Sequence, residues 1–232
     1  MRKFQRRAAR RAAIGALVAL TAVISACSST QGPTTANQTS APASSSTMPT
    51  AQATAPTGSG VTKISDIFGP ACDQVPQQGP GSAQGMVNDP VATAASHNPL
   101  LTTLTKAVTT ANLVDTLNNA PAITVFAPAD PAFAALEAQH PGILTQLTTA
   151  PNVTSPDSQL AKTLTYHVVG QRYDAAGIVA AGTLPSLEGA KLTIGGTPTA
   201  PTVNGAPVLC GNIPTKNATV FVIGQVLTPP TS

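Results

Sequence analysis

Apolar residues in the first half of the chain recur at the spacing of one helix face, and pairs of Asp or Asn with Pro interrupt them. An Asx residue at the N-cap followed by proline at the first helical position signals a helix start. Helices are therefore expected after Asp89-Pro90, Asn98-Pro99 and Asp130-Pro131, over Val91–Ser96, Leu100–Val108 and Ala132–Ala138. Two further helical segments are expected at Asn112–Leu117 and, after Ser155-Pro156, through Leu160 and Leu164.

The second half is made of short β-favouring runs, at Leu184–Leu187, Lys191–Ile194, Thr202–Val203, Pro207–Cys210 and Thr219–Leu227. Two pairs between these runs, Gly195-Gly196 and Asn204-Gly205, suit tight hairpin turns. One more strand, Ile123–Phe126, stands among the helices. The pattern predicts an α+β fold in which helices lead and a β meander closes the chain.

The basic residues are concentrated at the N-terminus, where six of the 12 Lys and Arg occupy the first eleven positions. Fifteen uncharged residues follow, 12–26, and small residues end that run. This arrangement predicts a secretory signal peptide over residues 1–26, because the apolar run is shorter than the roughly 20 residues that span a bilayer. Beyond it, six basic residues stand against nine acidic ones, a formal charge of −3, so nucleic acid is not an expected partner.

The end of the signal segment, Ile24-Ser25-Ala26-Cys27, resembles the bacterial lipobox. In lipoproteins the cysteine thiol receives a diacylglyceryl group and becomes the mature N-terminus, so Cys27 is the predicted lipid attachment site. Two acyl chains give stable anchoring, which a single chain does not. The alternative is an ordinary signal peptide that happens to end near a cysteine.

Residues 27–60 form the predicted tether, because 15 of the 33 residues after Cys27 are Ser or Thr, four are Pro and none is charged. Such a segment cannot bury enough apolar surface to offset its ordering entropy, so we expect it to be disordered. An O-glycosylated stalk and an unmodified spacer both fit this composition. Charges and apolar periodicity begin beyond it, which predicts an N-terminal extension over 61–84 and one domain over 85–232.

Five ordered motifs resemble those of fasciclin (FAS1) domains: residues 124–133, 164–169, 187–192, 203–206 and 217–230. The first is Thr-Val-Phe-Ala-Pro-Ala-Asp-Pro-Ala-Phe, the second contains Tyr166-His167, and the last ends in Leu-Thr-Pro-Pro. The stretch Gly79–Leu104, the lipobox and the tether are similar to mycobacterial fasciclin lipoproteins known as cell-surface antigens. The resemblance implies a wedge of two β-sheets flanked by several helices, and a non-enzymatic adhesion or recognition role.

Within the first motif, Phe126 should belong to a core strand that Pro128 ends, and Asp130 should cap the helix that buries Phe133. Tyr166 and His167 carry over from the family's adhesive motif. Asn212-Ile213 occupies the stretch where integrin-binding animal members often carry Asp-Ile, so the resemblance does not extend to integrin-type recognition.

His167 also has a structural interpretation, as a buried core residue that Asp130 or a nearby backbone carbonyl orients. The other histidines, His97 and His140, do not share a metal-ligand spacing with it, so no metal site is expected. The sequence also has no hydrolase elbow and no Walker or dinucleotide-binding glycine motif. We therefore expect no catalytic residue and no cofactor.

With Cys27 assigned to lipid, Cys72 and Cys210 remain as a pair in an exported, disulfide-permissive setting. Their disulfide would pin the extension 61–84 onto the β half; the alternative is two unpaired buried thiols. In the chain-entropy model, closing a loop of this length stabilises by up to about 5 kcal/mol.

These features together predict a lipoprotein on the outer face of the cell membrane, with a fraction of it shed. Its monomeric fasciclin domain would recognise a host, matrix or envelope protein or glycan through exposed loops. A carrier of a small apolar ligand or envelope lipid, held between sheet and helices, is the alternative function. A hydrolase is a third candidate, but no motif supports it.

Overall fold

The computed structural model describes residues 60–230 of the chain. The predicted signal peptide, the lipid site at Cys27 and the tether up to residue 59 lie outside the described residues. Helices dominate the first half of this region and strands the second, as the apolar pattern predicts. Within residues 60–230, no helix has the length and hydropathy needed to cross a bilayer.

The helices are α1 (Ala83–Met86), α2 (Val91–Ser96), α3 (Thr102–Thr110), α4 (Val114–Asn119), α5 (Asp130–Gln139), α6 (Ile143–Thr149), α7 (Gln159–Tyr166) and α8 (Ala175–Ala181). Three short 3-10 turns accompany them, η1 (Ile64–Asp66), η2 (Cys72–Gln74) and η3 (Pro99–Leu101). The strands are β1 (Ile123–Pro128), β2 (Val168–Val169), β3 (Thr183–Pro185), β4 (Lys191–Thr197), β5 (Ala200–Val203), β6 (Ala206–Pro214) and β7 (Ala218–Ile223).

The strands follow the order β2-β1-β7-β6-β5-β4-β3, and only the β1–β7 pair is parallel. Strand β6 joins two parts of this arrangement, because Ala206 and Pro207 pair with β5 whereas Val208–Pro214 pair with β7. At the far ends, Ser186 bridges Val169 of β2, so the two edges of the sheet meet. This two-part arrangement agrees with the wedge that the family resemblance implies.

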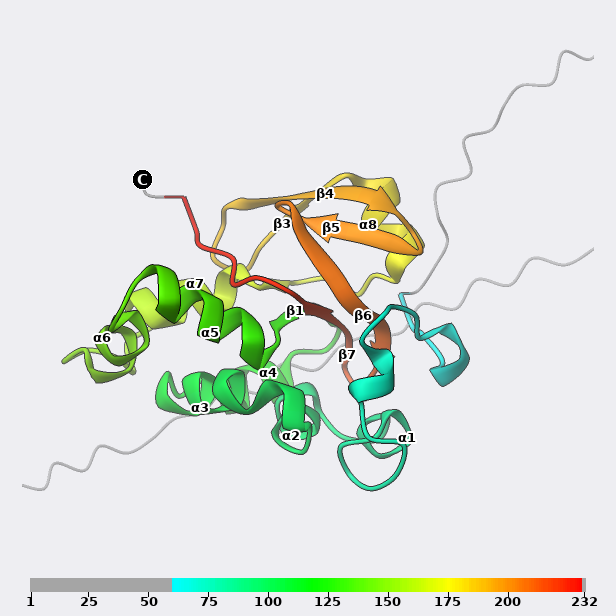
Figure 1. The fold of residues 1–232 in the computed structure, drawn as a ribbon, viewed down its shortest axis with the longest axis horizontal. Helices are drawn as coiled ribbons and strands as arrows, with labels where there is room; N and C mark the ends of the chain where they lie inside the picture. The colour runs from blue at the N-terminus through cyan, green and yellow to red at the C-terminus, as the bar shows by residue number, and fades with distance from the viewer. Residues whose placement is uncertain (1–59, 231–232) are drawn as a thin grey trace, which may run out of the picture. The chain divides into compact units, whose positions relative to one another are not determined.

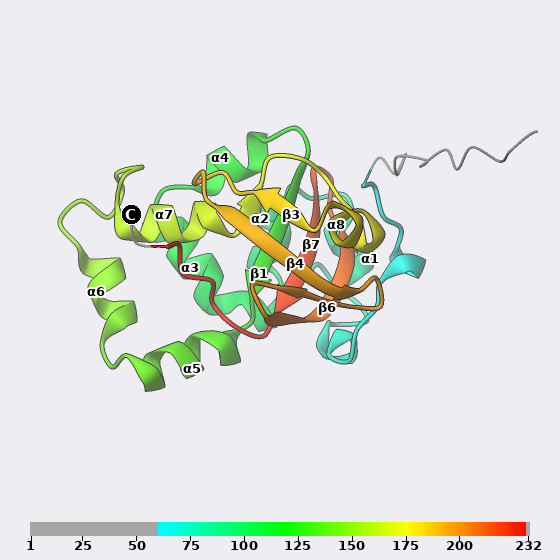
Figure 2. The same ribbon diagram turned by 90° about the horizontal axis from the view of Figure 1, so that it is seen from above.

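Strands β1 and β7 separate two hydrophobic cores, and their alternate side chains point into one or the other. Val125 and Val220 belong to the core under the helices, whereas Phe126 and Phe221 belong to the core formed with β3–β6 and α8. The two phenylalanine rings lie 5.6 Å apart. Figures 1 and 2 show β1 and β7 between helices α2–α7 and the hairpin strands. All six residues of each strand are buried because both faces are covered.

Helix starts only partly follow the predicted caps. Asn98 caps its helix as expected, since its side chain accepts from the Leu100 N–H at 3.0 Å. Asp89 was expected to cap α2, but Pro90 occupies the N-cap and Asn217 Oδ1 accepts from the Val91 N–H at 2.9 Å instead. The cap of α7 is Ser158, three residues after the expected Ser155.

The two glycine-containing pairs have different outcomes. Asn204-Gly205 forms the expected turn between β5 and β6, with φ of 48° and 82°. Gly195-Gly196 was expected to form a turn but lies inside β4, and the chain reverses between Thr197 and Ala200. A Cβ at Gly196 would lie 2.2 Å from the Ala200 carbonyl oxygen, so the second glycine permits the close approach of β5.

The extension 61–84 is held against β6, as the disulfide prediction requires. Cys72 and Cys210 form the disulfide, with Cα atoms 5.0 Å apart. Phe68 and Gly211 exchange backbone hydrogen bonds of 3.3 and 2.8 Å. A Cβ at Gly211 would lie 2.5 Å from the Phe68 ring, so only glycine allows this contact.

Candidate functional site

The Tyr-His motif at the end of α7 is inside the domain rather than on its surface. Tyr166 is 3% exposed, and its hydroxyl donates to the Lys191 carbonyl at 3.2 Å and accepts from Asn204 Nδ2 at 2.7 Å. Because Asn204 forms the β5–β6 turn, Tyr166 ties α7 to that hairpin. Its side chain is therefore not available for the direct partner contact that the adhesive motif implies.

His167 is equally buried, at 3% exposure, and both ring nitrogens have partners. Nδ1 lies 2.7 Å from the Thr163 carbonyl, which can only accept, and the Leu227 N–H donates to Nε2 at 2.9 Å. These partners require the neutral ring with its proton on Nδ1. The predicted burial is observed, but Asp130 does not orient the ring: the Thr163 carbonyl does, from within α7.

Burial decides the protonation of His167. Desolvation lowers the pKa of the imidazole to about 4, and the hydrogen bond to the Thr163 carbonyl opposes this shift. The ring is therefore neutral at pH 7, and it holds the C-terminal segment 224–230 against the domain through the Leu227 N–H.

Asp130 has a different role from the one predicted. It is the first residue of α5, after the N-cap Ala129, and its carboxylate reaches the start of α3. Oδ1 accepts from the Thr103 N–H at 2.8 Å, and Oδ2 accepts from the Thr102 hydroxyl at 2.6 Å and the Thr102 N–H at 3.3 Å. Partial burial raises the pKa of this carboxyl, but the hydrogen bonds outweigh that effect and lower it. Asp130 therefore caps α3 and ties it to α5.

An apolar cavity of about 150 Å³, which we call the larger cavity, lies among α3, α5, α6 and α7. Pro128 and Phe133 of the first family motif line it, and so does His167. Val226 of the C-terminal segment lines it as well, next to the Leu227 N–H that His167 holds.

A smaller apolar cavity of about 60 Å³ lies among α2, α3, α4, α7 and β1. It shares Leu104, Leu164 and His167 with the larger cavity, so these three residues form the wall between the two. Phe126 contributes to its floor, and Leu187, 47% exposed, stands at its edge.

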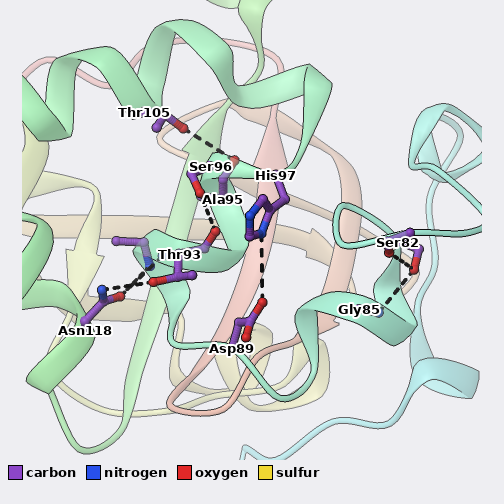
Figure 3. Close-up of polar contacts among 11 residues, drawn as sticks. Ser82, Gly85, Asp89, Thr93, Ala95, Ser96, His97, Thr105 and Asn118 are labelled. Carbon is purple, nitrogen blue, oxygen red and sulfur yellow. Dashed lines mark hydrogen bonds and ion pairs between the residues drawn. The ribbon is translucent and has the colours of Figure 1, made fainter.

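Polar contacts fix helix α2, which supplies one side of the smaller cavity (Figure 3). Asn118 Oδ1 accepts from the Ala92 N–H at 2.9 Å, and its Nδ2 donates to the Thr93 hydroxyl at 3.2 Å. The Thr105 hydroxyl lies 3.4 Å from the Ala95 carbonyl. Asn118 thus ties α4 to the first turn of α2, and Thr105 of α3 lies close to the end of α2.

Known proteins resemble this chain over most of its length. The family model of the Fasciclin domain matches residues 99–229. The chain belongs to the fasciclin family. The immunogenic protein MPB70 of Mycobacterium bovis is 43% identical over 173 residues, which cover 71% of this chain and 83% of MPB70. The cell surface glycolipoprotein MPB83 of the same organism is 39% identical over 231 residues, covering 96% of this chain and 97% of MPB83.

A solved structure shares the fold of this fasciclin domain. The FAS1 domain pair from the insect cell adhesion molecule Fasciclin I superimposes with a TM-score of 0.55 at 18% identity. The match covers 62% of this chain and 52% of that chain. The expected α+β fasciclin fold is therefore confirmed.

The family motifs of this fasciclin domain build the cavities instead of a surface. Phe126, Pro128, Phe133 and His167 all line one or both of them, and Asp130 joins the two helices above the larger one. Asn212, in the stretch of the animal Asp-Ile motif, is also buried, where it accepts from the Ala175 N–H and donates to the Asp66 carbonyl. The motifs therefore shape the interior of the domain.

The chemistry available in this interior is apolar binding. Among residues 60–230, no three His, Cys, Asp or Glu side chains lie close enough together to hold a metal ion. His167, the titratable group between the cavities, is hydrogen-bonded at both nitrogens. What the site offers is space lined mainly by apolar side chains.

Lys106 on α3 and Val226 in the C-terminal segment line the larger cavity, and no signal in the sequence marks either as a site residue. The apolar residues Leu100, Leu104 and Val108 recur at helical spacing, which predicts that this face is buried. Nothing in such a pattern distinguishes a face that fills the core from one that borders a cavity. Lys106 is on the same helix, yet a single lysine among threonines carries no recognisable spacing.

Proposed function

We propose that this protein is an exported, lipid-anchored surface protein whose fasciclin domain acts as a non-enzymatic recognition module for a host, matrix or envelope protein or glycan. The observation that carries the proposal is the match to a cell surface glycolipoprotein along 96% of the chain, far beyond the domain itself. A diacylglyceryl group on Cys27 would hold the protein at the outer face of the membrane, and the tether would separate the domain from it.

Recognition in this proposal belongs to exposed loops, since Tyr166, His167 and Asn212 are buried. The turn that begins at Leu187 is one such loop, because this leucine is 47% exposed beside the smaller cavity. A recognition surface on loops agrees with a rigid interior, in which the motif residues hold the scaffold.

The test compares attachment of three strains to arrays of immobilised proteins and glycans: wild type, a deletion, and a strain with Cys27→Ala. We expect the deletion to lose attachment to at least one immobilised ligand, and complementation to restore it. The Cys27→Ala strain should behave like the deletion while its medium or cell extract still contains the protein. Attachment that stays the same in all three strains on every surface would contradict the proposal.

A second candidate function is transport or storage of a small apolar ligand, and the paired cavities favour it. An apolar cavity of about 150 Å³ stays dry and binds a molecule the size of benzene. Native mass spectrometry of the protein purified from its own cells tests this candidate. A bound lipid at one-to-one stoichiometry would support the carrier function; protein that is free of ligand and also binds no added apolar molecule would refute it.

A further inference from the structure

We propose that the larger cavity receives the alkyl chain of a single-chain amphiphile with an anionic head group, and that Lys106 binds that head group. The proposal rests on the second candidate function and specifies its ligand class. It combines two features of the same site, an apolar interior and a cationic edge.

The interior suits an alkyl chain because the polar groups of Thr148, Thr163 and His167 that line it already have partners. The Thr148 hydroxyl donates to the Leu144 carbonyl at 2.7 Å, and the Thr163 hydroxyl donates to the Gln159 carbonyl at 2.8 Å. Both bonds lie within the residues' own helices, and both nitrogens of His167 are occupied as well. A sugar or another polar ligand would lose its hydrogen bonds to water here without replacement, whereas a hydrocarbon chain would lose none.

The edge suits an anion because Lys106 is cationic and, within residues 60–230, has no carboxylate within 4.0 Å. It lines the cavity from α3 while its side chain reaches solvent. Among residues 60–230, the one ion pair within 4.0 Å joins His97 and Asp89, not Lys106.

The acidic residues on the neighbouring helix α5 are already engaged. Asp130 binds the first turn of α3, and Glu137 accepts from the backbone N–H groups of Gly142 and Leu144 at the start of α6. Both carboxylates keep their charge, but within residues 60–230 neither forms an ion pair with Lys106 within 4.0 Å. A carboxylate or similar anion on the ligand would complete the site, with its chain directed inward and its head at the lysine.

Three eight-carbon probes separate the contribution of the chain from that of the head group: octanoate, 1-octanol and octylammonium. Calorimetric titration would use residues 28–232, the mature chain without its lipid-accepting cysteine. We expect one octanoate per chain, weaker binding of octanol, and the weakest binding of octylammonium, which Lys106 repels. Equal affinity for octanoate and octylammonium would overturn the proposal.

Substitution of the lysine tests its role. Lys106→Gln should lower the affinity for octanoate by up to about fivefold, the factor expected for a solvent-exposed ion pair, and leave the affinity for octanol unchanged. The matched control is Lys162→Gln, at an exposed lysine of α7 that lines neither cavity. If the two variants bind octanoate alike, Lys106 does not hold the head group and the proposal fails.

A substitution that fills the larger cavity tests whether the alkyl chain of the ligand lies there. Ala107 is buried at the cavity wall, so Ala107→Leu should occupy part of the space and reduce the affinity for octanoate and octanol by at least about tenfold. Leu144→Phe, at a half-buried wall position on α6, provides a second filling variant if the first does not fold. If a variant with a filled cavity folds and still binds octanoate like wild type, the alkyl chain lies elsewhere and the proposal is overturned.

The probes also distinguish failure of this proposal from failure of the carrier function on which it rests. Octanol binding as tightly as octanoate, with no effect of Lys106→Gln, would leave an apolar carrier without an anionic preference. No binding of any of the three probes would refute both.

Discussion

The neutral, buried His167 predicts a specific dependence of stability on pH. In the unfolded chain a histidine titrates near pH 6.5, whereas burial lowers the pKa of His167 to about 4 in the folded domain. Between these values the unfolded chain binds a proton that the folded chain does not. The contribution of His167 to stability is therefore complete above about pH 6.5 and is lost as the pH falls toward 4.

The size of the effect follows from the two pKa values. At about 1.4 kcal/mol per pH unit, the interval from 6.5 to about 4 corresponds to about 3 kcal/mol of unfolding free energy. Protonation would place a charge between two apolar cavities and remove the acceptor of the Leu227 N–H. Release of the C-terminal segment is the expected structural consequence.

Urea unfolding of wild type and His167→Gln at several pH values between 7.5 and 4 measures the effect. Glutamine does not titrate, and its side-chain oxygen offers a replacement acceptor for the Leu227 N–H. Carboxylates that titrate in this range contribute to both proteins, so the difference between the two curves isolates the histidine. His140→Gln removes an exposed histidine and serves as the control, whose curve should follow that of wild type.

We expect wild type to lose about 3 kcal/mol more than His167→Gln between pH 7 and pH 4. NMR titration of the imidazole provides an independent measurement, in which the folded protein should keep His167 neutral at pH 5. Parallel stability curves for the two proteins, or an imidazole that titrates near pH 6.5 in the folded state, would refute the reasoning.

Three further predictions concern the contacts that hold the helices and the extension. Asp130→Ala should lower the free energy of unfolding by about 2 kcal/mol at pH 7 in urea, because the carboxylate caps α3. Asp130→Asn should lower it by less, and an unchanged midpoint in Asp130→Ala would contradict this role. Asn217→Ala should cost about 2–3 kcal/mol, because it leaves the Val91 N–H and the Leu117 and Ala120 carbonyls without their side-chain partner, whereas the exposed Asn152→Ala should cost little. Replacing both disulfide cysteines by alanine should lower the unfolding free energy by up to about 5 kcal/mol, with hydrogen exchange rising first at Phe68; full protection there would show that the backbone contacts alone hold the extension.

Local signals in the sequence predicted the elements that depend on local chemistry. Asn98 caps its helix and Asn204-Gly205 turns its hairpin, because a short polar side chain or a positive φ meets the requirement within a few residues. Val91–Ser96 forms the expected helix, although the side chain that accepts from its first N–H group belongs to Asn217.

Long-range contacts explain why Asp130 and Asp89 do not cap the helices that they were expected to cap. Asp130 begins a helix as expected, but its carboxylate binds another helix 28 residues earlier in the chain. The cap of α2 comes from Asn217, 126 residues away, and no local pattern could assign it.

Helix α8 was not predicted at all, since its alanines and glycine have no distinct periodicity and Asp174 alone marks its start.

The cavities could not be predicted from the sequence, because each is lined by side chains from at least four segments. The residues that line them are apolar, and an apolar pattern predicts burial without predicting how well the space is filled. The family motifs could be recognised as structural, but their placement around a shared wall at His167 depends on how α3 and α7 pack.

The central claim is that a lipid displays this fasciclin domain at the cell surface. Mass spectrometry of the N-terminal peptide of the protein, taken from the membrane fraction, tests this claim most directly. We expect a mature chain that begins at Cys27 and carries a diacylglyceryl group on the cysteine sulfur. An N-terminus at another residue, or an unmodified Cys27 in protein that is nevertheless exported, would contradict it.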